Sequence, residues 1–208
     1  MSGPFKGIKV LELTSTVSGP FAGMMLADQG ADVIKVEPPG IGDLARFMGT
    51  IKDGMGAMFS TLNRNKKCIC LDFKNTEDLE IFKQLATSAD VLIENYRPGI
   101  VKKLGIDYET LSALNPDLIY CSISGYGQTG PYKNKKVYDP LIQGTVGIPN
   151  AQNTEKPQLV KTIIYDKVTG MTSAQAISAA LFQREKGEGG QYLPCLLYTS
   201  PSPRDSCA

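Results

Sequence analysis

Short apolar runs alternate along the chain with longer segments in which apolar residues recur at helical spacing. The short runs are bounded by Gly, Pro and Asp, and they predict strands at residues 8–13, 32–36, 68–72, 91–94 and 118–122. Helical spacing predicts helices at residues 19–29, 76–86 and 169–186, with Thr76 as a cap and small residues in the last helix for close packing. This alternation is typical of an α/β fold with a mostly parallel sheet.

Two segments of the chain resemble each other. Residues 31–40 read ADVIKVEPPG and residues 89–99 read ADVLIENYRPG, so each segment runs from a helix end through a strand to a Pro-Gly turn. In open α/β sheets the loops after such strands line the ligand crevice, which makes residues 37–46 and 95–103 the predicted site loops. Turn chemistry alone can also generate such an echo.

The end of the chain differs in style from the rest. Residues 193–208 read LPCLLYTSPSPRDSCA, with no periodicity and a Ser-Pro core, which predicts a disordered tail after an α/β region at residues 1–192. Because the YTSPSPRD run looks like translated adapter sequence, we expect the true protein to continue beyond residue 192 with other residues, and this chain to be a truncated form of it.

Composition narrows the chemistry. Lys and Arg number 22 against 21 Asp and Glu, and a net charge of +1 gives no field for general binding to nucleic acid or an anionic membrane. The chain has no histidine, which excludes Ser-His-Asp triads, Cys-His dyads and His-ligated metals, and we expect no metal site. No apolar stretch reaches the length of a membrane span.

Cysteine usage indicates a reducing compartment. The five cysteines are odd in number and irregularly spaced, unlike a secreted disulfide framework. We therefore expect a cytoplasmic protein with free thiols, and we expect Cys68 and Cys70 to pack in the core rather than to do chemistry.

A glycine-rich run, GYGQTG, occupies residues 125–130 and has the glycine spacing of a dinucleotide-binding turn. Pro131 and a Lys-rich segment stand where that motif needs a helix N-terminus, which argues against a nicotinamide or flavin site. A loop that exposes its backbone near a ligand remains compatible with this sequence.

Basic residues gather in three loop segments rather than along one face. They are Arg64, Lys66 and Lys67; Arg97, Lys102 and Lys103; and Lys133, Lys135 and Lys136. The segments either converge on a ligand carrying several phosphates or are solvated surface charges, which is the usual state of exposed Lys.

Carboxylates offer the remaining chemistry. Asp166 stands where an apolar run meets the longest helical pattern, and a carboxylate there can cap the helix or serve as a nucleophile that forms acyl intermediates. Tyr138 and Asp139 show the same ambiguity, because a tyrosine can donate to an oxyanion or merely pack.

Ordered blocks of sequence resemble one family, the class III CoA-transferases, which also include α-methylacyl-CoA racemases. The matching blocks include GIKVLELTSTVSGPFAGMMLADQGADVIKVEPPGIGDLAR, LNRNKKCICLDFK, ADVLIENYRPGIVKKLGIDYETL, NPDLIYCSISGYGQTGPY and the Asp166 segment, and they extend from about Pro4 to Tyr192. The resemblance implies the Rossmann-like N-terminal part of that fold, an interlocked homodimer, and acyl-CoA and a small carboxylic acid as substrates, with no tightly bound cofactor.

Site residues follow from the same resemblance, position by position. The implied catalytic group is the Asp166 carboxylate, with Tyr138 and Asp139 beside the reacting acyl group. The implied CoA contacts are Thr16, Val17, Pro38, Leu71, Asn95, Arg97, Lys103 and Lys136. Some members of the family carry a basic residue at the position of Pro38.

The implied reaction moves CoA between an acyl-CoA and a carboxylic acid through aspartyl anhydride and aspartyl-CoA intermediates. Racemases of the family use a His base at the position of Tyr138, and a phenol is a poor base at neutral pH, so transfer is favoured over racemisation. The alternatives are a racemase, isomerase or hydratase of CoA esters, and a truncated CoA-binding fragment without activity.

Overall fold

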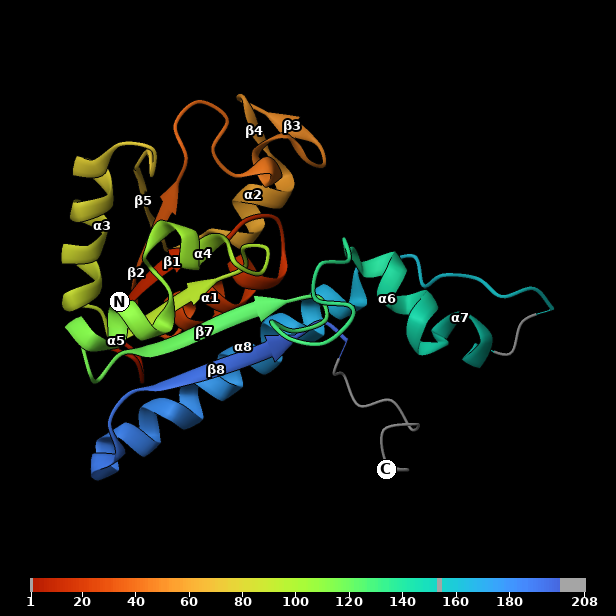
Figure 1. Cartoon of the computed structure of the whole chain (residues 1–208). Helices are drawn as coiled ribbons and strands as arrows, with labels where there is room; N and C mark the ends of the chain where they lie inside the picture. Colours follow the sequence, from red (N-terminus) through yellow and green to blue (C-terminus); the bar gives the residue numbers. More distant parts are fainter. Residues whose placement is uncertain (1, 153–154, 199–208) are drawn as a thin grey trace.

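The computed structural model describes residues 2–152 and 155–198 of the 208-residue chain. Its centre is a six-stranded sheet in the order β5-β2-β1-β6-β7-β8, with every neighbouring pair parallel (Figure 1). The strands are β1 (Lys9–Leu13), β2 (Asp32–Glu37), β5 (Lys67–Cys70), β6 (Val91–Glu94), β7 (Ile119–Ser124) and β8 (Gln191–Leu196). A small antiparallel hairpin, β3 (Ile51–Lys52) with β4 (Met55–Gly56), lies outside this sheet.

Helices connect the strands. They are α1 (Ser18–Asp28), the 3-10 turn η1 (Leu44–Phe47), α2 (Ala57–Leu62), α3 (Thr76–Thr87), α4 (Ile100–Leu104), α5 (Tyr108–Leu114), α6 (Asp139–Val146), α7 (Ile148–Ala151), α8 (Ile164–Gln183) and the π-helical turn η2 (Arg184–Glu188). The segment of α6 and α7 extends away from the main body (Figure 1).

Two apolar cores lie on opposite faces of the sheet, because successive strand residues point to opposite sides. Val10 joins the core that includes α1 and α8, whereas its neighbour Leu11 joins the core that includes α3, α4 and α5. The result is a three-layer α/β/α arrangement, and the expected Rossmann-like fold class is confirmed.

The five strands expected from the sequence are present, with ends that differ by a few residues. Two helix details differ. The α3 cap is Asn75, whose side chain accepts a hydrogen bond from the Glu77 N–H at 2.9 Å, so the expectation for Thr76 is wrong. Helix α8 begins at Ile164, ahead of the predicted start at residue 169, and this places Asp166 in its first turn.

Residues 193–198 do not form a disordered tail. β8 pairs with β7 in parallel register as far as Leu196, and Cys195 and Leu197 are buried, with exposures of 7% and 6%. Backbone pairing and apolar burial outweigh the irregular composition, and Pro194 is tolerated because β8 is an edge strand. The rest of the expected tail, residues 199–208, lies outside the described residues.

Cysteine burial differs from the expectation for one pair. Cys68 and Cys70 are exposed, because β5 is the other edge of the sheet, so core packing is the wrong interpretation for both. Cys121 and Cys195 are the buried thiols among the described residues. Within the same residues, no helix is both long and apolar enough to cross a membrane.

Candidate active site

A cavity of about 470 Å³ opens at the carboxyl ends of β1, β6 and β7. It lies where the strand order reverses on either side of β1, which is the usual ligand position in open α/β sheets. Its walls are residues 15–18 after β1, residues 95–98 and Ile100 after β6, residues 123–125 and 133–138 at and after the end of β7, Asp166 and Leu197. The loop after β6 that the sequence predicted is thus a wall of the cavity.

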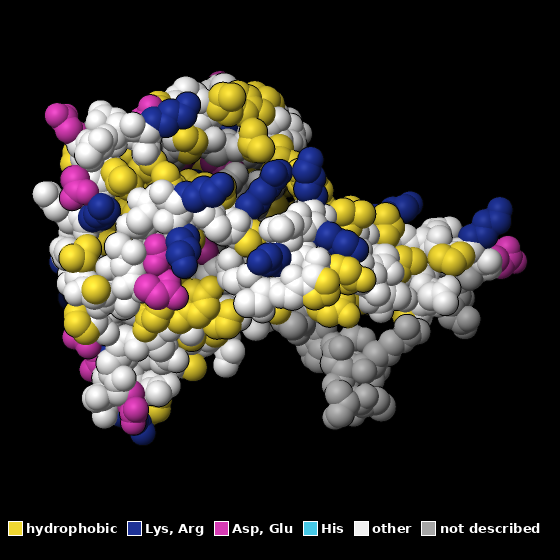
Figure 2. All heavy atoms as spheres, in the orientation of Figure 1, with side chains coloured by type: hydrophobic (Ala, Val, Ile, Leu, Met, Phe, Trp, Pro, Cys, Tyr) yellow, Lys and Arg dark blue, Asp and Glu magenta, His cyan; other side chains and the backbone are white. Residues whose placement is uncertain are grey.

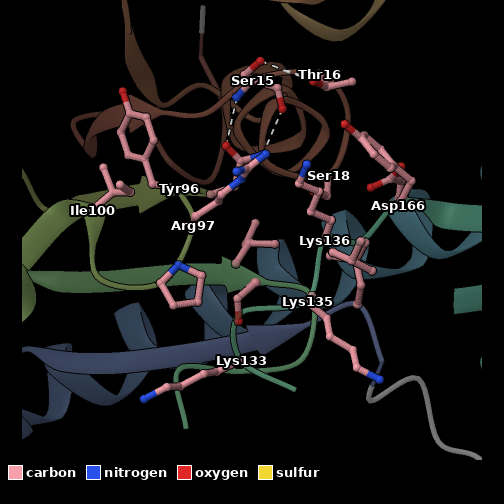
Figure 3. Close-up of a pocket in the computed structure, with 18 of the residues that line it drawn as sticks. Ser15, Thr16, Ser18, Tyr96, Arg97, Ile100, Lys133, Lys135, Lys136 and Asp166 are labelled. Atoms are coloured by element: carbon pink, nitrogen blue, oxygen red, sulfur yellow. Dashed lines mark hydrogen bonds between the residues drawn. The ribbon is translucent and has the colours of Figure 1, made fainter. Parts of the chain in front are cut away.

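Asp166 lies on this wall, in the first turn of α8, and is partly buried (Figure 3). Burial raises the pKa of its carboxyl to about 6, and the nearby charge of Asp139 contributes in the same direction. A hydrogen bond from the Ser18 side chain acts in the opposite direction. The carboxyl is therefore more basic than an ordinary Asp, yet still ionised at neutral pH, as a carboxylate nucleophile requires.

Two close-packed helices bring Ser18 to Asp166. α1 and α8 pack against each other, and a Cβ added at Gly170 of α8 would lie 2.8 Å from the Ser18 carbonyl oxygen. The small residues of α8 thus permit the close approach that the sequence predicted. Ser18 is not among the site residues predicted from the sequence, although its place between a strand end and the Gly-Pro helix start was a usable signal.

Asp139 lies behind Asp166 rather than on the cavity wall. It is 1% exposed, and its Oδ2 accepts the backbone N–H groups of Tyr165 at 2.6 Å and Asp166 at 3.1 Å. Its Oδ1 accepts from Gln143 Nε2 at 2.5 Å. The cap of α8 is therefore Asp139, not Asp166, and the expectation that Asp139 touches the reacting acyl group is replaced by a supporting role.

Tyr138 does line the cavity, and it is 69% exposed. It immediately precedes α6, so its side chain projects from a helix start rather than from the core. A hydroxyl in this position is available to a ligand in the cavity.

The Asn95 amide braces the opposite wall. Its Oδ1 accepts the Ser15 N–H at 3.0 Å, and its Nδ2 donates to the Ser15 carbonyl at 2.9 Å. Asn95 lines the cavity as expected, but both polar atoms of its side chain are committed to the backbone beside Thr16 and Val17, which also line it.

Four cationic side chains line the cavity: Arg97, Lys133, Lys135 and Lys136. The Lys136 side chain points toward Ser18, whereas those of Lys133 and Lys135 point away (Figure 3). Lys135 Nζ lies 3.6 Å from the centroid of the Tyr132 ring. Figure 2 shows Lys and Arg side chains gathered where the main body meets the α6 extension.

The remaining basic residues of the three loop segments do not line the cavity. Arg64 pairs with Asp28, Lys67 with Asp32, and Lys66 is buried against Glu12. Lys102 and Lys103 are exposed on α4 without lining the cavity. The positive charge at the cavity therefore comes from Arg97 and from the lysines of the loop after β7.

Three of the expected CoA contacts lie off the cavity wall. Pro38 is exposed in the loop after β2, Lys103 is exposed on α4, and Leu71 is 9% exposed within the core of the α3 side. Thr16, Val17, Asn95, Arg97 and Lys136 are brought together as expected. In the described part of the chain, no three His, Cys, Asp or Glu residues are placed to hold a metal ion.

The chain matches one family of known proteins over most of its length. The family model described as CoA-transferase family III matches residues 5–201. The human succinyl-CoA:glutarate CoA-transferase is 40% identical over 95% of this chain and 46% of its own length. The succinate–glutarate CoA-transferase of Agrobacterium fabrum is 42% identical over 93% of this chain and 51% of its own length.

A solved structure extends the likeness to the fold. The crystal structure of a CaiB/BaiF family protein from Brucella suis superposes with a TM-score of 0.88 and 41% identity, covering 95% of this chain and 54% of that one. The chain thus spans about half the length of the curated relatives it matches. Since the family model matches most of its residues, the chain belongs to CoA-transferase family III.

Proposed function

We propose that this protein transfers CoA from an acyl-CoA thioester to a carboxylic acid, with Asp166 as the nucleophile. The observation that carries the proposal is the Asp166 carboxyl, partly buried on the wall of the cavity with a pKa raised to about 6. A carboxylate of raised basicity that faces a ligand-sized cavity suits covalent acyl transfer.

The proposed reaction has four steps that balance without ATP. The Asp166 carboxylate attacks the donor thioester carbonyl, and the C–S bond breaks to give a mixed anhydride and CoA thiolate. The thiolate then attacks the aspartyl carbonyl and releases the donor acid. The acceptor carboxylate attacks this aspartyl-CoA thioester, and the released thiolate finally takes the new acyl group and frees Asp166.

Each step passes through a tetrahedral oxyanion. The start of α1 is a source of donors, because its N-cap Val17 makes no side-chain capping bond and the first N–H groups of a helix have no partner within it. Val17 and Ser18 line the cavity, as Asp166 does. Backbone N–H groups at a helix N-terminus suit an oxyanion.

The positive side chains suit the polyanionic part of CoA. Lys136 points into the cavity, and Arg97 lines it from the loop after β6. An Arg fork and a Lys point charge are the ordinary phosphate partners in proteins. In this proposal CoA is a substrate rather than a resident cofactor, and the interlocked homodimer implied by the family resemblance stays a prediction.

Short dicarboxylic acids are the first acceptors to assay, because both named relatives carry succinyl-CoA or succinate together with glutarate in their names. The 208-residue chain is incubated with succinyl-CoA and glutarate. Mass spectrometry should find CoA attached to the peptide that contains Asp166, and Asp166→Asn should abolish the adduct. The matched control, Asp107→Asn, changes a helix-capping carboxylate away from the cavity and should keep the adduct.

Three results would overturn the proposal. An adduct that persists in Asp166→Asn would exclude Asp166 as the nucleophile. Solvent deuterium entering the α-carbon of the acyl group without an acceptor would indicate an isomerase. CoA binding without adduct or turnover would indicate a CoA-binding unit.

A further inference from the structure

Four buried charged side chains lie beneath the wall formed by residues 15–18. Lys66 Nζ is 2.8 Å from Glu12 Oε2, and Lys35 Nζ is 3.0 Å from both Glu12 Oε1 and Asp43 Oδ2. The exposure of each of these side chains is at most 1%. We call these four residues the buried charge cluster; its charges alternate in sign and cancel.

The buried charge cluster ends on the backbone of the cavity wall. Lys35 Nζ donates to the Thr14 carbonyl at 2.7 Å, while Asp43 Oδ1 accepts the Thr16 N–H at 2.9 Å and the Ser15 hydroxyl at 3.2 Å. The Lys35 ammonium thus donates hydrogen bonds to Glu12 and to the Thr14 carbonyl, and it forms an ion pair with Asp43. Together with the Asn95 clamp on Ser15, every residue from 14 to 16 is held by a buried or partly buried side chain.

Thr16 needs such restraint. Its φ of 73° lies in the left-handed region, which costs a residue with a side chain about 1–2 kcal/mol. The bond from its N–H to Asp43 opposes relaxation to an ordinary conformation. Helix α1 begins two residues later, so the direction of the chain at Thr16 sets where Ser18 points.

The cluster also fixes α1 directly. Lys66 Nζ donates to the Pro20 carbonyl at 2.8 Å in the first turn of the helix. A Cβ added at Gly23 would lie 1.9 Å from Glu12 Oε2, so the helix rests on the Glu12 carboxylate with room only for glycine. Lys66 and Glu12 therefore restrain the first turns of α1, and Asp43 restrains the residue two positions before the helix begins.

Stability alone does not account for four buried charges, because apolar side chains of similar size often stabilise a core as well or better. We infer that Asp43 and Lys35 are positioning residues: with Glu12 and Lys66, they fix residues 14–16 and the start of α1, and so place Ser18 next to Asp166 on the wall that the two residues share. This inference rests on the proposed function in taking Asp166 as the reacting group.

The test is a double-mutant cycle read out on Asp166 in the 208-residue chain. The carboxyl is followed by ¹³C NMR titration, with Asp166→Asn used to assign its signal, in the parent, Asp43→Asn, Ser18→Ala and the double variant. Each single variant should raise the pKa of Asp166 by about one pH unit, the worth of a charge-assisted hydrogen bond. The double variant should match Ser18→Ala alone, because Asp43 acts through Ser18.

The direction of the pKa shift at Asp166 distinguishes a positioning role of Asp43 from a direct effect of its charge. Removing the negative charge of Asp43 would by itself lower the pKa of Asp166, whereas loss of the Ser18 bond raises it. The matched control is Asp90→Asn, since Asp90 also accepts a backbone N–H, from Lys9 at 2.7 Å, and pairs with a cation, Arg184, at 2.8 Å. Its loss should lower thermal stability without moving the titration of Asp166.

An Asp43→Asn effect no larger than that of Asp90→Asn, or one that adds to Ser18→Ala, would overturn the inference. If Asp43→Asn does not fold, Ser15→Ala removes one bond to Asp43 and enters the same cycle, with a smaller shift of the same sign expected. The titration needs no CoA. A chain that fails to transfer CoA would therefore overturn the proposed function while leaving this inference to its own result.

Discussion

The carboxylate of Asp139 accepts the backbone N–H of Asp166 at 3.1 Å, so the buried Asp139 caps the helix that presents Asp166 to the cavity. A free helix N-terminus would stabilise the Asp166 anion. Asp139 instead takes up those N–H groups, and its own negative charge adds to the burial that raises the pKa of Asp166. The same contact thereby orients Asp166 and keeps it basic.

Replacing Asp139 by Asn tests this relationship. We expect the pKa of Asp166 in Asp139→Asn to fall from about 6 toward the ordinary range of Asp, because a neighbouring negative charge is lost. Loss of capping should lower the free energy of unfolding by about 1 kcal/mol. ¹³C NMR titration and urea unfolding measure the two effects.

The control for this substitution is Asp107→Asn, which changes the cap of α5, where Asp107 accepts the Thr110 N–H at 3.2 Å. Stability should fall without any change at Asp166. An unchanged or raised pKa of Asp166 in Asp139→Asn would contradict the proposed charge effect.

Asp166 should also make stability depend on pH. Its folded pKa of about 6 is above the ordinary unfolded value of about 3.9, so its favourable contribution is complete below about pH 4 and is lost as pH rises through 6. Relative to the parent, Asp166→Asn should therefore gain on the order of 2 kcal/mol of unfolding free energy between pH 4 and pH 8. Urea unfolding at the two pH values measures this gain.

Asp107→Asn should change the pH dependence of stability in the opposite direction, because hydrogen bonds lower the pKa of Asp107 although desolvation acts to raise it. A lowered pKa stabilises the fold above the unfolded value, so this variant should lose more at pH 8 than at pH 3. Equal pH dependence in the two variants would show that neither environment acts as described.

The lysines beside the cavity should differ in their effect on CoA binding. Lys136 points toward Ser18, while the Lys135 ammonium lies over the Tyr132 ring and points away. We expect Lys136→Ala to raise the dissociation constant for CoA about tenfold, corresponding to about 1.4 kcal/mol. Lys135→Ala should change it less than twofold. Calorimetry at two salt concentrations measures both, and equal losses would contradict the assignment.

The sequence predicted those strands and site loops whose position follows from the local pattern of residues. Alternating apolar runs located β1 and β6, and the strand-end rule located the Asn95 and Arg97 wall. It could not locate β8, because the stability of residues 191–196 comes from pairing with β7, about 70 residues earlier in the chain. The residues of β8 themselves do not indicate that they will pair with β7.

Site roles show the same division. Asp166 was identifiable by its motif, whereas the capping by Asp139 requires the fold to bring two distant helix starts together. Lys66 belonged to a basic segment and was expected at the surface or on a phosphate. It is buried instead, because the fold places Glu12 against it.

Close packing of α1 on α8 should be sensitive to a single methyl group at Gly170. The added Cβ of Gly170→Ala would meet the Ser18 carbonyl oxygen and Phe21 Cδ1, both at 2.8 Å, so the helices must separate. We expect a loss of about 1–3 kcal/mol in unfolding free energy, the usual cost of overpacking.

The matched control is Gly144→Ala on α6, where a Cβ meets no atom within 4 Å. Here alanine should be neutral or stabilise the chain by up to about 1 kcal/mol, because it favours the helix. Separation of α1 from α8 also moves Ser18 away from Asp166, so Gly170→Ala should raise the pKa of Asp166 further, whereas Gly144→Ala should not. A Gly170→Ala chain as stable as the parent, with an unchanged Asp166 titration, would show that the two helices are not held in close contact.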